Sequence, residues 1–336
     1  MIKEMIEKID RKSDLSQKEA ELVMEEIMTG NASPEDMSAF LLALRKKGEA
    51  IDEITGAASI MRKHATKISV SAKNVLDTCG TGGDGAHTFN ISTISAFVAA
   101  GAGVVVAKHG NRSVSSKCGS ADILKALGVN IECDTKKVEA CIAEVGIGFL
   151  FAPLLHGAMK HAMPVRKKLG VRTIFNILGP LTNPAGARHQ LLGVFDGSLT
   201  KQLANVLGKL GSTHVLVVHG DDGLDEVTTT TDTVVSELIN GVVKTYKINP
   251  RDFGIEVAKP KDLTGGDTLV NKGIAEEILA GKKGPHRDIV ILNAGCAIYA
   301  ADKAKDIKSG IEMANEAIDS GKALQKLKTL IDFTNK

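Results

Sequence analysis

The spacing of apolar and polar residues over the first part of the chain, residues 1–70, predicts a run of helices. Ser16 and Glu19 form a capping-box pattern at the start of one of them. In the next helix Ser33 takes the N-cap position and Pro34 the first helical position. A third helix with apolar residues at helical spacing follows directly. This region therefore reads as a small all-helical unit.

After residue 73 the pattern changes to short β-branched runs that alternate with helices. The runs expected to be strands are residues 74–78, 103–107, 146–151, 189–195 and 214–220. Such alternation argues for a largely parallel sheet covered by helices. Residues 233–248 form a predicted hairpin, with Asn240 and Gly241 supplying the positive φ angles of its tight turn.

A later stretch, residues 155–169, has helical spacing again, so the helical unit can recruit it. We therefore predict an α/β protein with a small, sequence-discontinuous helical domain and a larger α/β domain with a mostly parallel central sheet. The helical domain is expected at residues 1–70, joined by a segment near residues 155–184, and the α/β domain at residues 74–336. A second G-G-D, residues 265–267, is interpreted as a helix cap and not as another phosphate site.

Composition narrows the class of protein. The 336 residues carry 42 Lys and Arg against 40 Asp and Glu, so no global field favours nucleic acid or an anionic membrane. The chain has no Trp and two Tyr, which leaves few platforms for stacking bases. Five cysteines without a C-x-x-C pair suit a reducing compartment, and the longest apolar run, residues 94–107, is too short to span a bilayer. We expect a cytoplasmic protein with neither a nucleic-acid nor a membrane partner.

The stretch DTCGTGGDGAHTFNIST, residues 77–93, follows a predicted strand and precedes a predicted helix. In that position backbone N–H groups can surround phosphate oxygens, and glycines leave room for an anion. An isolated G-x-G-G is more often a tight surface turn, and the stretch is neither a P-loop nor a dinucleotide fingerprint. Asp84 would repel a phosphate unless a cation lies between them, so it points to magnesium.

Two further polar loops come after predicted strands, where open parallel sheets place their ligand crevices. Residues 108–122 hold three cations and several hydroxyl and amide groups, which favours a polyanion site over a solvated loop. Residues 219–228 contain Asp225 and Glu226 side by side. Alone such a pair is usually solvated surface, but next to two phosphate loops it becomes a candidate Mg²⁺ site.

A fourth stretch, residues 156–184, places Arg166 on a predicted helix. A guanidinium suits bidentate contact with a carboxylate, although a lone helical Arg is more often part of a surface ion pair. His156 and His161 are more often packing residues than catalysts. Spacing alone does not decide between these interpretations.

Taken together, G-T-G-G-D, N-I-S-T, K-H-G-N-R-S and N-I-L-G-P-L-T-N-P resemble the motifs of the anthranilate phosphoribosyltransferases, and the likeness covers nearly the whole chain. The resemblance implies a fold of the nucleoside phosphorylase and phosphoribosyltransferase type. It implies transfer of the 5-phosphoribosyl group of phosphoribosyl pyrophosphate (PRPP) to the amino group of anthranilate, which gives N-(5-phosphoribosyl)anthranilate and pyrophosphate in tryptophan biosynthesis. A homodimer and Mg²⁺, two ions per monomer during turnover, are also implied, while association with an anthranilate synthase subunit stays open.

The same resemblance implies the site residues. PRPP would contact Gly80, Gly83, Asp84, Thr88, Asn90, Ile91, Ser92, Thr93, Lys108, His109, Gly110, Asn111, Arg112, Ser113, Val114, Ser115, Ser116 and Ser120. Mg²⁺ would be held by Ser92, Asp225 and Glu226. Anthranilate would meet Gly80, Asn111 and Arg166, with His109 and His156 lining its route or pocket. No indispensable catalytic base is expected, because the neutral aniline nitrogen is already a nucleophile.

Small departures from the family pattern are Cys118, where serine is commoner, and Met163, where glycine is commoner. Two rival functions are weighed against the transferase. A pyrimidine nucleoside phosphorylase of the same broad fold shares the glycine-rich loop and the K-H-G-N segment. A fold relative that binds nucleic acid would need a basic surface, which a net charge of +2 argues against.

Overall fold

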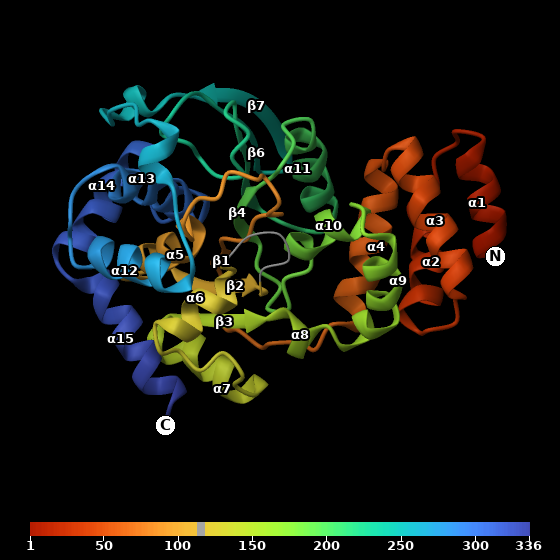
Figure 1. Ribbon diagram of the computed structural model, residues 1–336, viewed down its shortest axis with the longest axis horizontal. Coiled ribbons are helices and arrows are strands. Elements are labelled where there is room, and N and C mark those ends of the chain that lie inside the picture. Colours follow the sequence, from red (N-terminus) through yellow and green to blue (C-terminus); the bar gives the residue numbers. More distant parts are fainter. Residues whose placement is uncertain (113–117) are drawn as a thin grey trace.

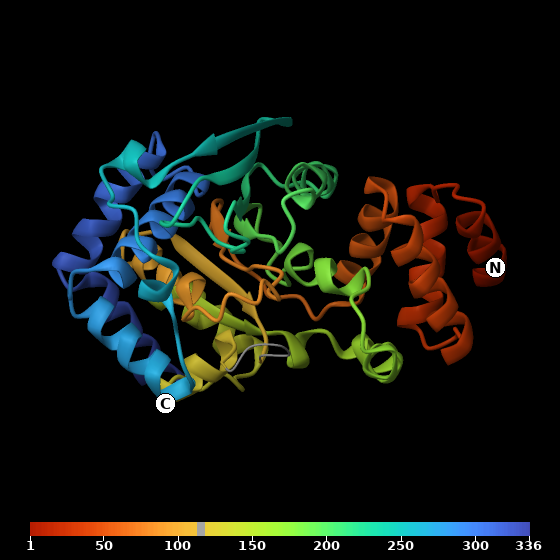
Figure 2. The same ribbon diagram turned by 45° about the horizontal axis from the view of Figure 1, so that its top comes forward.

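The computed structural model describes residues 1–112 and 118–336. Its first part is a bundle of four helices, set to one side of the rest of the molecule (Figures 1 and 2). These helices are α1 (Ile2–Asp10), α2 (Gln17–Met28), α3 (Pro34–Lys47) and α4 (Ile51–His64). The predicted caps are present: the Ser16 hydroxyl accepts the Glu19 N–H while the Glu19 carboxylate accepts the Ser16 N–H, and Ser33 caps α3.

The centre of the molecule is one seven-stranded sheet in the order β3-β2-β1-β4-β5-β6-β7. The strands are β1 (Val75–Asp77), β2 (Val105–Gly110), β3 (Ile147–Phe151), β4 (His189–Gly193), β5 (His214–Gly220), β6 (Thr233–Ile239) and β7 (Val242–Ile248). The first five are parallel and the last two run antiparallel as the expected hairpin. Asn240 and Gly241 have φ angles of 52° and 77°, as its turn requires. The prediction of a mostly parallel sheet is therefore confirmed.

Helices cover both faces of the sheet. After the bundle come α5 (Ile91–Gly101), α6 (Ser120–Ala126), α7 (Thr135–Ala140), the π-helix η1 (Cys141–Val145), α8 (Ala152–Leu155), the 3₁₀ turn η2 (Gly157–His161), α9 (Met163–Leu169), α10 (Phe175–Leu178), η3 (Gly179–Leu181) and α11 (Leu199–Lys209). The rest of the chain forms η4 (Pro250–Phe253), η5 (Pro260–Leu263), α12 (Thr268–Leu279), α13 (Pro285–Ala300), α14 (Ile307–Asp319) and α15 (Lys322–Thr334). In the described part of the chain no helix combines the length and apolar character needed to cross a membrane.

Alternate residues of the central strands point to opposite faces of the sheet and contribute to two hydrophobic cores. Leu191 and Leu216 face α5 and α13, whereas Leu192 and Val217 face α11 and the helical bundle. The second core continues without a break from the sheet into the bundle, so the two units share apolar packing. This shared packing fixes the bundle beside the carboxyl ends of the parallel strands, where the candidate site lies.

The later stretch with helical spacing, residues 155–169, is helical in three short pieces: the end of α8, the turn η2 and the short helix α9. Pro164 lacks an N–H, and its ring crowds the preceding turn, so α9 restarts beside it. In the folded chain η2 packs on α2 and α9 packs on α3 (Figure 1).

Candidate active site

The glycine-rich loop between β1 and α5 lies directly against the end of β4 and the loop after β5. The Gly82 N–H donates to Asp225 Oδ2 at 2.7 Å, and the Thr81 N–H donates to the Gly193 carbonyl at 2.9 Å. A Cβ on Gly80 would lie 2.9 Å from the same Asp225 oxygen. Bare backbone is therefore needed here for the close approach of a carboxylate as well as of any anion.

Three carboxylates converge beside this loop. The Asp225 N–H lies 3.5 Å from Asp84 Oδ2, and the Ser92 N–H donates to Glu226 Oε1 at 3.2 Å. Burial raises the pKa of Asp225 well above its usual range, and the nearby charges of Glu226 and Asp84 raise it further. Burial also raises the pKa of Glu226, to about 7, although Lys108 opposes the shift. Oxygen ligands with excess negative charge are what Mg²⁺ or Ca²⁺ would stabilise.

The end of β2 brings a buried cation to the same place. Lys108 is 3% exposed, and its ammonium group donates to the Thr78 carbonyl and approaches Ser92 Oγ at 3.5 Å. Lys108 therefore faces the start of α5, where the glycine-rich loop ends. The predicted residues Asp84, Ser92, Lys108, Asp225 and Glu226 are thus brought together at one edge of the sheet.

Two predicted anthranilate-side residues, His109 and His156, form a pair. Their Nε2 atoms are 3.1 Å apart, so one imidazole donates to the other. Burial lowers the pKa of His109 to about 3, and the charges of His156 and Lys108 contribute. Burial also lowers the pKa of His156, to about 4, with a contribution from Lys67. Both rings are therefore neutral at pH 7, and neither offers a cation to a ligand.

The remaining predicted residues have varied surroundings. Arg166 on α9 stacks on the Phe175 ring, 5.2 Å from its centroid, and forms no ion pair among the described residues. Arg112, in contrast, forms a surface ion pair, with its Nη2 atom 3.5 Å from Glu132 Oε1. Ser120 donates to the Asn111 carbonyl at 3.2 Å.

Other predicted residues line the loop and its flanks. Thr88 makes an isolated bridge with Thr264, whereas Ile91 and Thr93 are buried in the first turn of α5 and Gly110 ends β2. The predictions for Ser113, Val114, Ser115 and Ser116 lie outside the described residues.

Sequence reasoning missed Arg172, in the segment after α9. Its guanidinium donates to the Gly83 carbonyl and stacks on the Phe195 ring, 4.1 Å from the centroid. Arg172 therefore links the segment that follows α9 to the glycine-rich loop. Arg172 stands six positions after Arg166 in the same stretch of sequence. Spacing alone did not show that Arg172 is the arginine that contacts the glycine-rich loop.

Asp77 at the end of β1 was also missed. It is fully buried and accepts the His109 N–H at 3.0 Å and the Asn183 amide at 2.7 Å. Burial raises its pKa to about 6 despite these bonds. Asp77 is the first residue of the glycine-rich stretch. The sequence does not show that its carboxylate accepts an N–H at the end of β2 and so joins the ends of β1 and β2.

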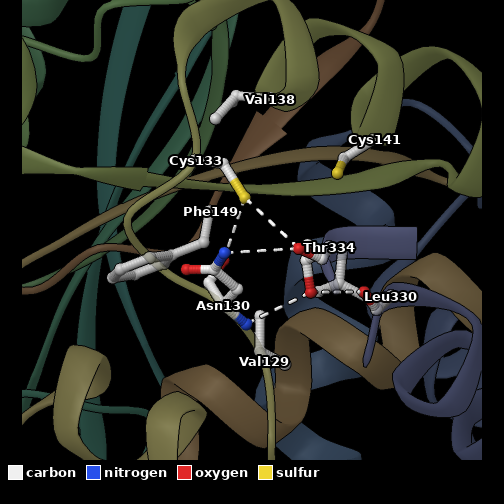
Figure 3. Close-up of a pocket in the computed structure, with 8 residues that line it drawn as sticks. All are labelled: Val129, Asn130, Cys133, Val138, Cys141, Phe149, Leu330 and Thr334. Carbon is white, nitrogen blue, oxygen red and sulfur yellow. Dashed lines mark hydrogen bonds between the residues drawn. The ribbon is translucent and has the colours of Figure 1, made fainter. Parts of the chain in front are cut away.

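A separate small hollow lies between α7, η1 and α15 (Figure 3). Figure 3 shows Cys133 directed at Thr334, whose hydroxyl accepts the Asn130 N–H at 3.1 Å. None of the residues that line it is a predicted site residue. It is a packing gap at the flank of the sheet and not part of the site.

Known proteins match both parts of the chain. Residues 3–65 match the family described as "Glycosyl transferase family, helical bundle domain", and residues 72–324 match "Glycosyl transferase family, a/b domain". The anthranilate phosphoribosyltransferase of Acetivibrio thermocellus is 55% identical, with 100% of this chain and 97% of that protein aligned. That of Desulfosudis oleivorans is 54% identical over 99% of each.

The chain belongs to the anthranilate phosphoribosyltransferase family. The resemblance seen in its motifs is thereby confirmed. The solved anthranilate phosphoribosyltransferase of Thermus thermophilus superposes with a TM-score of 0.94 at 43% identity, over 98% of this chain and 99% of that one. The Saccharomyces cerevisiae anthranilate phosphoribosyltransferase in complex with PRPP and Mg superposes with a TM-score of 0.87 at 30% identity, over 96% and 94%. The predicted architecture, a small helical domain beside a larger α/β domain, is shared across this family.

Proposed function

We propose that this chain transfers the 5-phosphoribosyl group of PRPP to the amino group of anthranilate, releasing pyrophosphate. The observation that carries the proposal is the convergence of the glycine-rich loop, Lys108 and three carboxylates at the carboxyl ends of parallel strands. Such a site suits a polyanion that arrives with a hard cation. Relatives with more than half of their residues identical are named for this activity.

Magnesium fits the residues present. Asp225, Glu226 and the Ser92 hydroxyl would hold it, since they are hard oxygen donors, and burial together with the neighbouring negative charge of Asp84 raises the pKa of both carboxyl groups. When bound, Mg²⁺ neutralises charge on the departing pyrophosphate. The third carboxylate, Asp84, supports the proposal of two ions per monomer, because three negative charges exceed what one divalent ion balances.

The chain's own residues position the reactants and match developing charge. N–H groups of the glycine-rich loop and the Lys108 ammonium are placed to stabilise negative charge on pyrophosphate as the bond to ribose C1′ breaks. Arg166, next to Phe175, is available for the anthranilate carboxylate because it has no acidic partner among the described residues. Gly80 and Asn111 would complete that pocket.

No side chain is proposed as an indispensable base. His109 and His156, the imidazoles nearest the proposed anthranilate route, have pKa values of about 3 and about 4, so at pH 7 they are poor proton acceptors. The neutral aniline nitrogen can attack C1′ unaided when it is held in line. A homodimer and a cytoplasmic location are proposed on the family resemblance, and no nucleic-acid or membrane partner is proposed.

The decay of anthranilate fluorescence with PRPP and Mg²⁺ tests this function. We expect decay with the wild type, and loss of at least about a hundredfold in rate for Asp225→Asn/Glu226→Gln, because charge stabilisation is lost. Arg166→Ala should raise the KM for anthranilate. One matched control is Asp221→Asn, because Asp221 lies in the same loop as Asp225 and Glu226 but pairs with Lys247 on β7. The other is Lys168→Ala, on the same helix as Arg166. Phosphorolysis of thymidine without anthranilate turnover would instead identify a phosphorylase.

A further inference from the structure

The G-G-D segment, residues 265–267, has no part in the proposed chemistry, yet it closes on the back of the glycine-rich loop. The Gly265 N–H donates to the His87 carbonyl at 3.0 Å, next to the bridge between Thr88 and Thr264. A Cβ on Gly265 would lie 2.6 Å from the Phe89 nitrogen. The segment is therefore built for contact with the residues that lead into α5.

Asn271, in the first turn of α12, joins this segment to the loop. Its side chain is buried, with a relative exposure of 2%. Oδ1 accepts the Gly266 N–H at 2.8 Å, and Nδ2 donates to Asn90 Oδ1 at 3.2 Å. Because a backbone N–H occupies the oxygen of Asn271, only one orientation of its amide satisfies both bonds. Asn271 must therefore present a donor to Asn90.

Asn90 is the residue before α5, but its side chain does not cap that helix. Its Nδ2 donates to the Cys118 carbonyl at 3.0 Å, and its Oδ1 is held by Asn271. An amide nitrogen carries two hydrogens, and among the described residues only the Cys118 carbonyl accepts one of them. Asn90 also stands two residues before Ser92, whose N–H binds Glu226. Asn90 therefore belongs to the same junction of loop and helix as Ser92, which contacts the carboxylates.

We propose that Asn271 is a positioning residue for PRPP binding, which fixes the amide of Asn90 with its nitrogen, and not its oxygen, available to the polyanion. The inference rests on the proposed function. In the flipped orientation Asn90 Oδ1 would face the Cys118 carbonyl and phosphate oxygens, which are all acceptors, and binding would weaken. Donors of this kind to a charged ligand are stronger than neutral pairs.

Asn271→Asp tests the role with little change in shape. The carboxylate still accepts the Gly266 N–H but cannot donate to Asn90, so the flipped amide becomes favoured. We expect the KM for PRPP to rise about tenfold, as loss of one charge-assisted hydrogen bond would produce, while the KM for anthranilate stays unchanged. The control is Asp267→Ala, which removes the side-chain cap of α12 and leaves Asn271 and Asn90 intact. It should lower the melting temperature without altering the KM for PRPP.

A double-mutant cycle separates positioning from a direct effect of the new charge. In an Asn90→Ala background, Asn271→Asp should change the KM for PRPP by less than about twofold, since it acts through Asn90. Two results would overturn the inference: a full tenfold rise in the KM for PRPP when Asn90 is already replaced by Ala, or no rise when Asn90 is present. Asn271→Ala in the same cycle gives the same answer if Asn271→Asp does not fold. An inactive wild type would instead refute the proposed function.

Discussion

At the scale of single residues, the site concentrates like charge and holds it with backbone donors. Asp225 accepts the Gly82 N–H and Glu226 accepts the Ser92 N–H, yet burial and the nearby charge of Asp84 keep the pKa of each carboxyl group raised. These hydrogen bonds therefore do not offset the cost of burying the two carboxylates. The ionised carboxylates therefore destabilise the metal-free fold, and either a proton or a bound cation relieves this cost. Metal binding and protonation of these groups are thereby linked.

This link predicts a pH-dependent stabilisation by Mg²⁺. The pKa of Glu226 is about 7 in the folded chain and 4.5 as its ordinary value, so the folded state binds its proton more tightly than the unfolded state. Without metal, stability therefore falls as pH rises through that interval. Excess Mg²⁺ should raise the melting temperature more at about pH 8 than at about pH 6, since it replaces the lost proton. Equal shifts at both pH values, or shifts that persist in Asp225→Asn/Glu226→Gln, would contradict this account.

Arg172 gives a second prediction at this scale. Arg172→Ala removes both the bond to the Gly83 carbonyl and the stacking on Phe195, which frees the glycine-rich loop. We expect the KM for PRPP to rise about three- to tenfold, as loss of one partly exposed hydrogen bond would cause. Arg172→Lys should recover only part, because a lysine stacks poorly. The control is Arg188→Ala, since Arg188 also binds a glycine carbonyl, that of Gly211, but away from the site. An Arg172→Ala enzyme with wild-type kinetics would show that the contact is incidental.

Sequence reasoning selects residues whose chemistry is carried by their own side chains. Asp225 and Lys108 are charged residues that follow strands, and the structure brings them to the same edge of the sheet. Asp77, Arg172 and Asn271 were missed because they act by holding backbone groups of other segments. Which carbonyl or N–H lies opposite a side chain depends on the folded path, and no local pattern encodes it.

At the scale of elements, local signals were sufficient for helix starts and the hairpin. Ser16, Ser33 and the Asn240–Gly241 turn take the roles that their residue types predict, because capping and turn chemistry involve only a few neighbours. The helical character of residues 155–169 was predicted, but the places where the segment is interrupted were not. Its apolar spacing is helical, but Pro164 and the packing of α9 on the bundle decide where the helix breaks.

Gly193, the last residue of β4, supports a prediction about this element. A Cβ there would lie 1.6 Å from the Asp225 carbonyl oxygen, and that atom is backbone. Gly193→Ala must therefore push the strand end and the acidic loop apart. We expect turnover to fall about a hundredfold, because a displacement near 1 Å is enough to misplace catalytic groups. Circular dichroism should remain that of a folded protein.

The control for Gly193 is Gly186→Ala, in the turn before β4. A Cβ at Gly186 meets no atom within 4 Å, but its φ of 64° makes any L-residue strained, so the change tests backbone strain without a clash. This variant should lose stability and keep its kinetic constants. A Gly193→Ala enzyme with wild-type turnover would mean that the acidic loop can move without consequence.

At the scale of the whole molecule, the alternation of strands and helices was sufficient to predict a parallel sheet but not its order. The sequence places β1, β2 and β3 in succession, whereas β4 pairs with β1 and so brings the loops after β1, β4 and β5 together. That order depends on contacts between residues more than a hundred positions apart. The shared core between bundle and sheet has the same origin, and the division at residues 70 and 74 stays a prediction.

Arg62 on α4 joins the two units directly. Its Nε donates to the Leu181 carbonyl at 2.6 Å and its Nη1 to the Leu210 carbonyl at 3.0 Å, so one guanidinium holds the ends of η3 and α11. Burial lowers its pKa to about 10, which leaves it charged at neutral pH. Arg166 lies on the bundle side of this junction and the glycine-rich loop on the sheet side. Arg62 therefore links the two parts of the molecule that carry the two proposed substrate sites.

Arg62→Met should loosen that junction while preserving most of the side-chain volume. We expect a loss of about 2 kcal/mol in unfolding free energy, since two buried carbonyls lose a charged donor. The KM for anthranilate should rise more than the KM for PRPP, because only anthranilate is proposed to contact the bundle-side helix α9. Lys63→Ala is the matched control, as the neighbouring Lys63 pairs with Glu25 inside the bundle at 3.2 Å. If Arg62→Met is less stable but changes both KM values equally, Arg62 holds the fold together without setting the separation of the two substrates.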